Sequence, residues 1–121
     1  MATEISVRAT HKWAGGSLSF CEHPSSSCQT AMRFSIYVPS GEGPFAVLYW
    51  LSGLTCSEEN FMTKSGVAPL AKQQPMIVVA PDTSPRGCPV KGDQDSWDFG
   101  VGAGFYVNAT EPGWSEHYKM Y

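Results

Sequence analysis

Apolar and polar side chains alternate along residues 30–38, which predicts a β-strand with one buried face. The apolar positions are Met32, Phe34, Ile36 and Val38. Successive side chains of a strand point to opposite faces, so we expect these four on the core face of an antiparallel strand. A shorter strand is expected at 17–21, and the proline and serines of 23–27 predict a loop after it.

Two further apolar runs, at 45–51 and 76–80, flank a predicted helix. Both are continuous rather than alternating, as in strands buried on both faces. The helix spans about 57–73 and is interrupted by Gly66 and Pro69, either as two short pieces or with Pro69 opening a second helix. Strand, helix and strand form a βαβ unit with a parallel crossover. The expected fold is therefore α/β, with a mixed sheet that starts antiparallel and continues through this crossover.

The turn after the run at 45–51 carries the clearest candidate chemistry. Thr55 and Glu58 have the spacing of a capping box, which predicts a helix start directly after the strand. Backbone N–H groups at such a turn can hold a bound anion or the oxyanion of an acyl-transfer intermediate. We therefore assign the Leu54 N–H as the candidate oxyanion donor, with Gly53 making the turn. The alternative is an ordinary turn in which Gly53 only supplies a positive φ.

Cys56 lies at the predicted helix start, where the helix dipole would favour its thiolate. It is a candidate nucleophile, although a small buried side chain is the competing interpretation. A cysteine nucleophile needs a histidine base, and His11, His23 and His117 have no spacing that indicates a pairing.

Metal ligation is a weaker alternative. Cys21, His23 and Cys28 would need His11 as a fourth ligand, and the C-x-x-C spacing of structural zinc sites is absent. An acidic cluster follows at 93–98, but it lacks the glycine and glutamate of a calcium loop. We expect no metal. We expect Asp93 and Asp95 to be solvated turn residues, and Asp98 to cap backbone N–H groups.

Residues 83–112 are rich in glycine and aromatics and predict a long functional loop. Trp97 and its aromatic neighbours could line a pocket or simply pack the loop. The first turns of a helix are expected at 114–121.

Length and composition change this picture little. The 121 residues predict one domain, 1–121, with a net charge of −3 that gives no reason to expect nucleic acid as a partner. No apolar run approaches the roughly 20 residues of a membrane helix, and no secretory core is seen, so a cytoplasmic location with free thiols is expected.

Several motifs in order resemble the S-formylglutathione hydrolase family, also called esterase D. They are Leu51-Ser52-Gly53-Leu54-Thr55-Cys56, Asn60-Phe61, Lys64-Ser65-Gly66, Ala80-Pro81-Asp82-Thr83-Ser84-Pro85-Arg86-Gly87, Asp95-Ser96-Trp97-Asp98-Phe99-Gly100, Gly102-Ala103-Gly104-Phe105-Tyr106-Val107 and Ala109-Thr110. The resemblance runs through nearly the whole chain.

The resemblance implies an α/β-hydrolase fold and a cytosolic, homodimeric serine thiolesterase without cofactor. Such enzymes hydrolyse S-formylglutathione, a glutathione thioester, to glutathione and formate in formaldehyde detoxification, and they also cleave carboxylesters. The resemblance also gives Leu54 the role of oxyanion donor and places Cys56 and Trp97 near the active site.

One family feature has no match in this sequence. No serine lies in a G-x-S-x-G nucleophile elbow, so none of the catalytic triad can be assigned. The expectation is an N-terminal part of the fold, truncated before the elbow and inactive alone, with the strand at 45–51 left as an exposed edge. The alternatives are a non-catalytic half-domain that complements another chain, and a small Cys56-dependent esterase.

Overall fold

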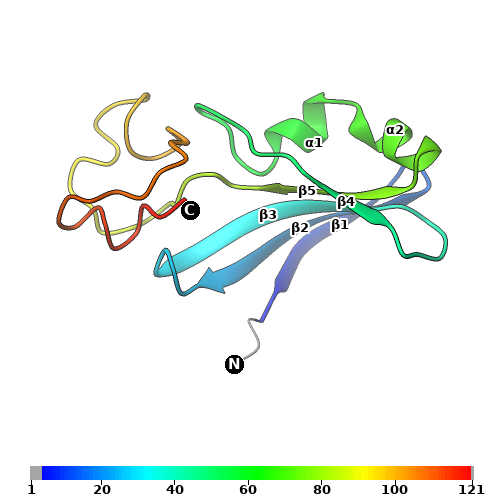
Figure 1. Ribbon diagram of the computed structural model, residues 1–121, viewed down its shortest axis with the longest axis horizontal. Coiled ribbons are helices and arrows are strands. Elements are labelled where there is room, and N and C mark those ends of the chain that lie inside the picture. Colours follow the sequence, from blue (N-terminus) through cyan, green and yellow to red (C-terminus); the bar gives the residue numbers. More distant parts are fainter. Residues whose placement is uncertain (1–3, 121) are drawn as a thin grey trace.

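The structure, a computed structural model, describes residues 4–120 and is built on one five-stranded sheet with two short helices on one face (Figure 1). In chain order the elements are β1 (Ser6–Trp13), β2 (Gly16–Ser25), β3 (Thr30–Val38), β4 (Ala46–Tyr49), α1 (Asn60–Lys64), α2 (Val67–Gln73) and β5 (Met76–Pro81). The strand order across the sheet is β1-β2-β3-β5-β4.

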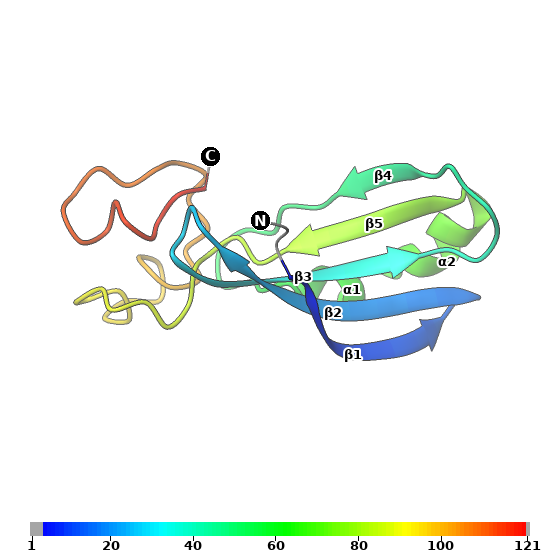
Figure 2. The same ribbon diagram turned by 90° about the horizontal axis from the view of Figure 1, so that it is seen from below.

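The sheet is mixed, as the sequence predicts. Strands β1, β2, β3 and β5 pair antiparallel in that order, and β4 pairs parallel to β5 (Figure 2). The chain passes from β4 through both helices to β5, so the predicted βαβ crossover is confirmed. The expected α/β fold class is therefore correct.

The hairpin of β1 and β2 was only partly predicted from the sequence. Strand β1 was not predicted, although Val7, Ala9 and Trp13 alternate with polar residues, and most of its side chains are exposed. Strand β2 continues to Ser25, so the loop expected at 23–27 is wrong over its first three residues. The two strands are joined by Ala14 and Gly15, both with positive φ (45° and 77°), the conformation that closes tight hairpins.

The buried face of β3 is the opposite of the predicted one. Ser35 and Tyr37 are fully buried beneath the helices, whereas the four apolar alternates are half-buried on the other face. Burial of these polar groups is tolerated because both are hydrogen-bonded. The Ser35 hydroxyl donates to the Glu58 carbonyl (2.6 Å), and the Tyr37 hydroxyl donates to the Ala14 carbonyl (3.2 Å). The core on this face comprises Leu18, Tyr37, Met62, Ala68, Ala71, Val78 and Ala80.

Strand β4 is an exposed edge. All four of its residues are exposed, so the prediction of a strand buried on both faces is wrong. Within residues 4–120, β4 pairs only with β5, and the expectation of an open edge at this strand is confirmed. Figure 1 shows both helices above the sheet and no element covering its lower face.

The predicted helix 57–73 forms as two pieces, α1 and α2, separated at Ser65 and Gly66. The predicted capping box is wrong, because Thr55 has a left-handed φ of 66° and α1 begins only at Asn60.

Residues 112–117 form turns rather than the predicted helix, and Lys119 then pairs with Asn108 in a short bridge. No helix in the described part of the chain is long and apolar enough to cross a membrane.

Candidate functional site

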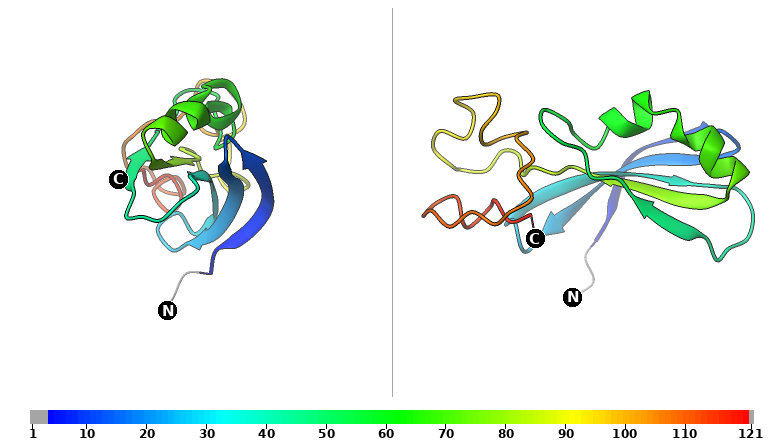
Figure 3. Two further views of the ribbon diagram at one scale, coloured as in Figure 1. Left: turned by 90° about the vertical axis from the view of Figure 1, so that its right-hand side faces the viewer. Right: turned by 45° about the horizontal axis from the view of Figure 1, so that its top comes forward.

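The turn at residues 52–56 lies beyond the carboxyl end of β4, beside the long segment 83–112 (Figure 3). Ligand sites of open α/β sheets lie at the carboxyl ends of the parallel strands, so this turn occupies a favourable position.

Hydrogen bonding divides the backbone amides of this turn into a paired group and an unpaired group. The Thr55 amide donates to the Gly102 carbonyl (2.7 Å), and the Cys56 amide donates to the Gly53 carbonyl (3.1 Å). The amides of Ser52, Gly53 and Leu54 donate to no other residue within 4–120, and Leu54 is the one assigned from the sequence as the candidate donor. The positive φ belongs to Thr55 and not to Gly53, so the alternative role for Gly53 is wrong. A Cβ on Gly53 would meet nothing within 4 Å, so the space beside the Gly53 α-carbon is open.

Residues of the segment 83–112 hold the turn in place through hydrogen bonds and close packing. The Thr83 hydroxyl donates to the Ser52 carbonyl (3.0 Å), and the Tyr106 hydroxyl donates to the same oxygen. Gly104 packs so closely that a Cβ there would lie 3.4 Å from the Gly53 carbonyl, and its φ of 68° also favours glycine. These contacts fix the backbone on both sides of Leu54.

Arg86 fixes the other end of the turn. Its guanidinium holds the Asp82 carboxylate in two contacts, Nε to Oδ2 (2.6 Å) and Nη2 to Oδ1 (3.2 Å). The same Nη2 donates to the Cys56 carbonyl (3.0 Å). The hydrogen bond to Asp82 raises the pKa of Arg86 and outweighs the opposing effect of burial, so Arg86 stays charged. Asp82 and Arg86 both stand in the family-like run 80–87, but their sequence alone did not reveal this role.

Replacing Arg86 with methionine is expected to destabilise the fold and loosen the turn. The Asp82 side chain is only 3% exposed, and removing one partner of a buried ion pair leaves an uncompensated charge. Because Arg86 itself is more than one-third exposed, solvent screening reduces the expected loss to about 2 kcal/mol. Urea unfolding of the variant measures this loss.

The matched control is the double variant Arg86→Met with Asp82→Asn, which removes the orphaned charge and should recover part of the loss. Equal stability of wild type and Arg86→Met would contradict the structural role given to Arg86.

Cys56 has no histidine base in the described chain. His117 donates from Nδ1 to the Cys28 carbonyl (2.8 Å), and His23 donates to the Pro24 carbonyl (3.2 Å). His11 packs edge-on against Phe20. Residues 4–120 therefore bring no imidazole to the Cys56 sulfur, and the structure does not favour Cys56 as a nucleophile.

Cys56 is expected to be the first cysteine modified by a thiol reagent. It is half-buried, whereas the other three cysteines are buried, and all four thiols are free. Burial also raises the pKa of Cys21 and of Cys88, which keeps these two as unreactive thiols. Mass spectrometry after brief exposure to N-ethylmaleimide should find one label, on Cys56. The Cys56→Ala variant should stay unlabelled over the same time, and rapid labelling of a second cysteine would contradict the burial pattern.

The other candidate residues lie apart from the turn. Trp97 stands at the tip of a tight turn closed by Ser96 and Phe99, and its side chain is 69% exposed. No hydrogen bond or ring contact joins it to residues 52–56 within the described chain, and its place near the active site stays a prediction. Residues 4–120 contain no group of three or more His, Cys, Asp or Glu side chains arranged to hold a metal ion.

The acidic cluster differs from expectation. Asp93 is buried rather than solvated and accepts a hydrogen bond from the Tyr118 hydroxyl (3.1 Å). Burial of the phenol, together with the neighbouring Asp93 charge, raises the pKa of Tyr118. The Asp98 carboxylate accepts a hydrogen bond from the Ser96 hydroxyl instead of capping backbone N–H groups. Asp95 is exposed, as predicted.

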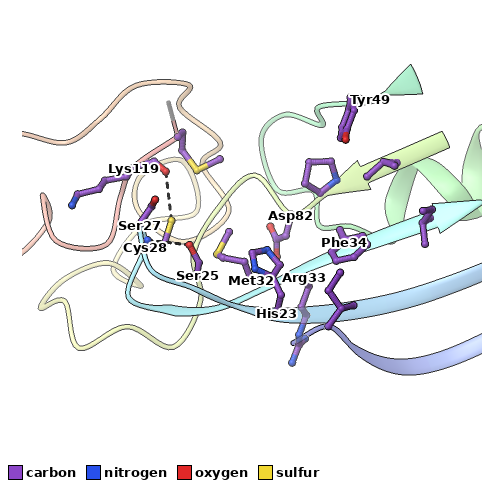
Figure 4. A pocket seen from close by; sticks show the side chains of 15 residues that line it. His23, Ser25, Ser27, Cys28, Met32, Arg33, Phe34, Tyr49, Asp82 and Lys119 are labelled. Carbon is purple, nitrogen blue, oxygen red and sulfur yellow. Dashed lines mark hydrogen bonds between the residues drawn. The ribbon is translucent and has the colours of Figure 1, made fainter. Parts of the chain in front are cut away.

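A groove of about 700 Å³ lies on the uncovered face of the sheet and not at the turn (Figure 4). Met32, Phe34 and Tyr49 are among its apolar lining residues, and none of residues 52–56 contributes. The groove therefore does not serve as a pocket for the candidate oxyanion donor in this chain.

Fold and turn together define the class of protein as an α/β hydrolase. The structure superposes on a solved S-formylglutathione hydrolase from Agrobacterium tumefaciens with a TM-score of 0.88 and 40% identity, over 94% of this chain and 42% of that one. Residues 25–121 match the model of a family described as putative esterase. The chain belongs to this esterase family.

Curated relatives agree with this assignment. The S-formylglutathione hydrolase of Mus musculus is 51% identical over 115 residues, which are 93% of this chain and 41% of the relative. That of Rattus norvegicus is 49% identical over 120 residues, which are 98% of this chain and 43% of the relative. The chain thus spans about two-fifths of the length of the relatives it matches.

Proposed function

We propose that this chain supplies the oxyanion-binding turn of a thiolester hydrolase that acts on S-formylglutathione. The observation that carries the proposal is the Leu54 amide, which has no partner within residues 4–120 while the backbone on both sides of it is fixed. A fixed, unpaired N–H costs no reorganisation when negative charge develops beside it. The S-formylglutathione hydrolases that resemble the chain support the choice of substrate.

The proposed chemistry is acyl transfer. A nucleophile attacks the formyl carbon, the carbonyl oxygen gains negative charge, and the Leu54 N–H donates a hydrogen bond to that oxygen. The carbon–sulfur bond then breaks and glutathione leaves as the thiol. Water hydrolyses the acyl-enzyme and releases formate.

The nucleophile comes from polypeptide outside this 121-residue sequence, which has no G-x-S-x-G elbow. Two donors usually share the oxyanion, one of them the amide that follows the nucleophile, and that donor is also outside the sequence. We therefore propose that the chain alone is inactive and becomes active only beside a chain that carries the serine, its acid and its histidine.

Three further properties belong to the same proposal. The enzyme works on a small molecule in the cytoplasm as part of formaldehyde catabolism, it needs no cofactor, and the complete enzyme is a homodimer. Simple carboxylesters are side substrates, since their hydrolysis passes through the same tetrahedral oxyanion.

Hydrolysis of p-nitrophenyl acetate tests the proposal. The purified chain alone should show no turnover above buffer. Co-expression with the remaining three-fifths of the mouse relative as a separate polypeptide should restore turnover, and that polypeptide alone should be inactive. Turnover by the present chain alone that disappears in Cys56→Ala would contradict the proposal and support the cysteine-dependent esterase instead.

A further inference from the structure

The backbone of the turn at 53–56 has a conformation that its own sequence does not favour. The Cys56 amide donates to the Gly53 carbonyl, so Leu54 and Thr55 are the two central residues of a β-turn. Thr55 has a φ of 66°, whereas Leu54 has no positive φ. A positive φ at the second central residue alone is the pattern of a type II turn, which favours glycine or asparagine there. A β-branched threonine in this conformation is unusual and persists only where other contacts hold it.

Gly102 supplies the contact that holds Thr55. The Thr55 amide donates to the Gly102 carbonyl (2.7 Å). Type I and type II turns differ by a reversal of the peptide between the two central residues, which here joins Leu54 to Thr55. Because this peptide carries the Thr55 N–H, the bond to Gly102 holds it in the type II orientation. Without the bond, threonine favours the negative φ of a type I turn, and the reversal would change the backbone conformation of Leu54.

Ser84 in turn fixes Gly102. The Ser84 hydroxyl accepts a hydrogen bond from the Gly102 amide (2.9 Å) and donates its own proton to the Pro85 carbonyl (3.1 Å). Ser84 is only 2% exposed, so solvent competes little for either bond. Its amide donates to the Asp82 carboxylate (3.2 Å), which anchors the serine from the other side. The amide of Gly102 is therefore held by Ser84 while its carbonyl holds Thr55.

We propose that Ser84 is a positioning residue for the hydrolysis. Through Gly102 it keeps Thr55 in the left-handed conformation, and the turn then presents the Leu54 N–H to the oxyanion. This inference deepens the proposed function and rests on it. All the hydrogen bonds that carry it join residues of this chain to one another.

Steady-state kinetics of the reconstituted enzyme test the proposal. Ser84→Ala should lower kcat by about 10–100-fold with little change in KM, because a small displacement of a group that acts in the transition state costs rate. Tyr37→Phe is the matched control, since it also deletes a hydroxyl that donates to a backbone carbonyl, that of Ala14 in the first hairpin. It should keep the wild-type kcat. An unchanged kcat in Ser84→Ala, or an equal loss in Tyr37→Phe, would overturn the proposal.

A second substitution in the turn distinguishes positioning from a general loss of structure. Glycine adopts a positive φ at little cost, so in Thr55→Gly the type II turn no longer needs the hold of Ser84. The double variant Thr55→Gly with Ser84→Ala should therefore recover much of the kcat that Ser84→Ala loses. A double variant no more active than Ser84→Ala would contradict the proposal.

Amide hydrogen exchange separates this inference from the proposed function. In the isotope-labelled 121-residue chain, the Thr55 amide should exchange at least about tenfold faster in Ser84→Ala than in wild type. The rate is taken relative to the amide of Val78, which is fully buried in β5, so that a change in global stability cancels. An unchanged ratio would overturn the proposal. A wild-type complex without activity would instead refute the proposed function, and the exchange ratio would still decide whether Ser84 holds the turn.

Discussion

Replacing Leu54 with proline is expected to lower the hydrolase activity of the reconstituted enzyme by about 10²–10³-fold, the effect of losing one oxyanion donor. Proline has no backbone N–H, so the substitution removes the proposed donor itself. The position tolerates the change in two respects. Leu54 does not have a positive φ, and its amide makes no hydrogen bond within the described chain that proline would break.

The matched control is Leu54→Ala, which keeps the N–H and removes only a side chain that is already exposed. Its activity should stay within a few-fold of wild type, and the loss in Leu54→Pro should fall on kcat rather than on KM. Equal activity of the proline and alanine variants would show that the Leu54 amide does not hold the oxyanion.

Replacing Tyr37 with alanine is expected to cost about 3–5 kcal/mol of folding free energy, the range for truncating a buried aromatic side chain. Tyr37 is fully buried under the helices and packs edge-on against Trp13 at 6.3 Å between ring centroids. Its ring also lies so close to Gly16 that a Cβ there would approach within 2.9 Å. A loss of this size is a large part of the total stability of a small domain.

Chemical unfolding of Tyr37→Ala and Tyr37→Phe separates packing from hydrogen bonding. The phenylalanine variant keeps the ring and loses only the bond to the Ala14 carbonyl, so it should cost about 1 kcal/mol. If alanine and phenylalanine cost the same, the core does not centre on the Tyr37 ring.

The sequence predicted most of the sheet, though not β1, because the signals of the other strands are local. The alternation at 30–38 and the two apolar runs each gave a strand in the correct direction, although β4 is exposed rather than buried on both faces. The buried side of β3 was not predictable in this way, because burial depends on which face the helices cover. Ser35 and Tyr37 can be buried on that face because their hydroxyls donate hydrogen bonds to the carbonyls of Glu58 and Ala14, which are distant in the sequence.

The role of Leu54 as the oxyanion donor stays a prediction, but the local structure around it can be compared with expectation. The position of the turn and the choice of Leu54 followed from a strand that ends at glycine. The capping box failed because Thr55 adopts a left-handed conformation and bonds to Gly102, a contact across 47 residues that spacing cannot reveal. The roles of Arg86 and Tyr106 were missed for the same reason, since both act on backbone carbonyls far away in the sequence.

The most direct test of the central claim is a crystal structure of the reconstituted enzyme inhibited by a phosphonate that mimics the tetrahedral intermediate. We predict that the phosphonyl oxygen lies about 2.7–3.1 Å from the Leu54 nitrogen, the distance of an oxyanion-hole bond. A phosphonyl oxygen held only by other donors, with the Leu54 amide turned away from it, would contradict the account.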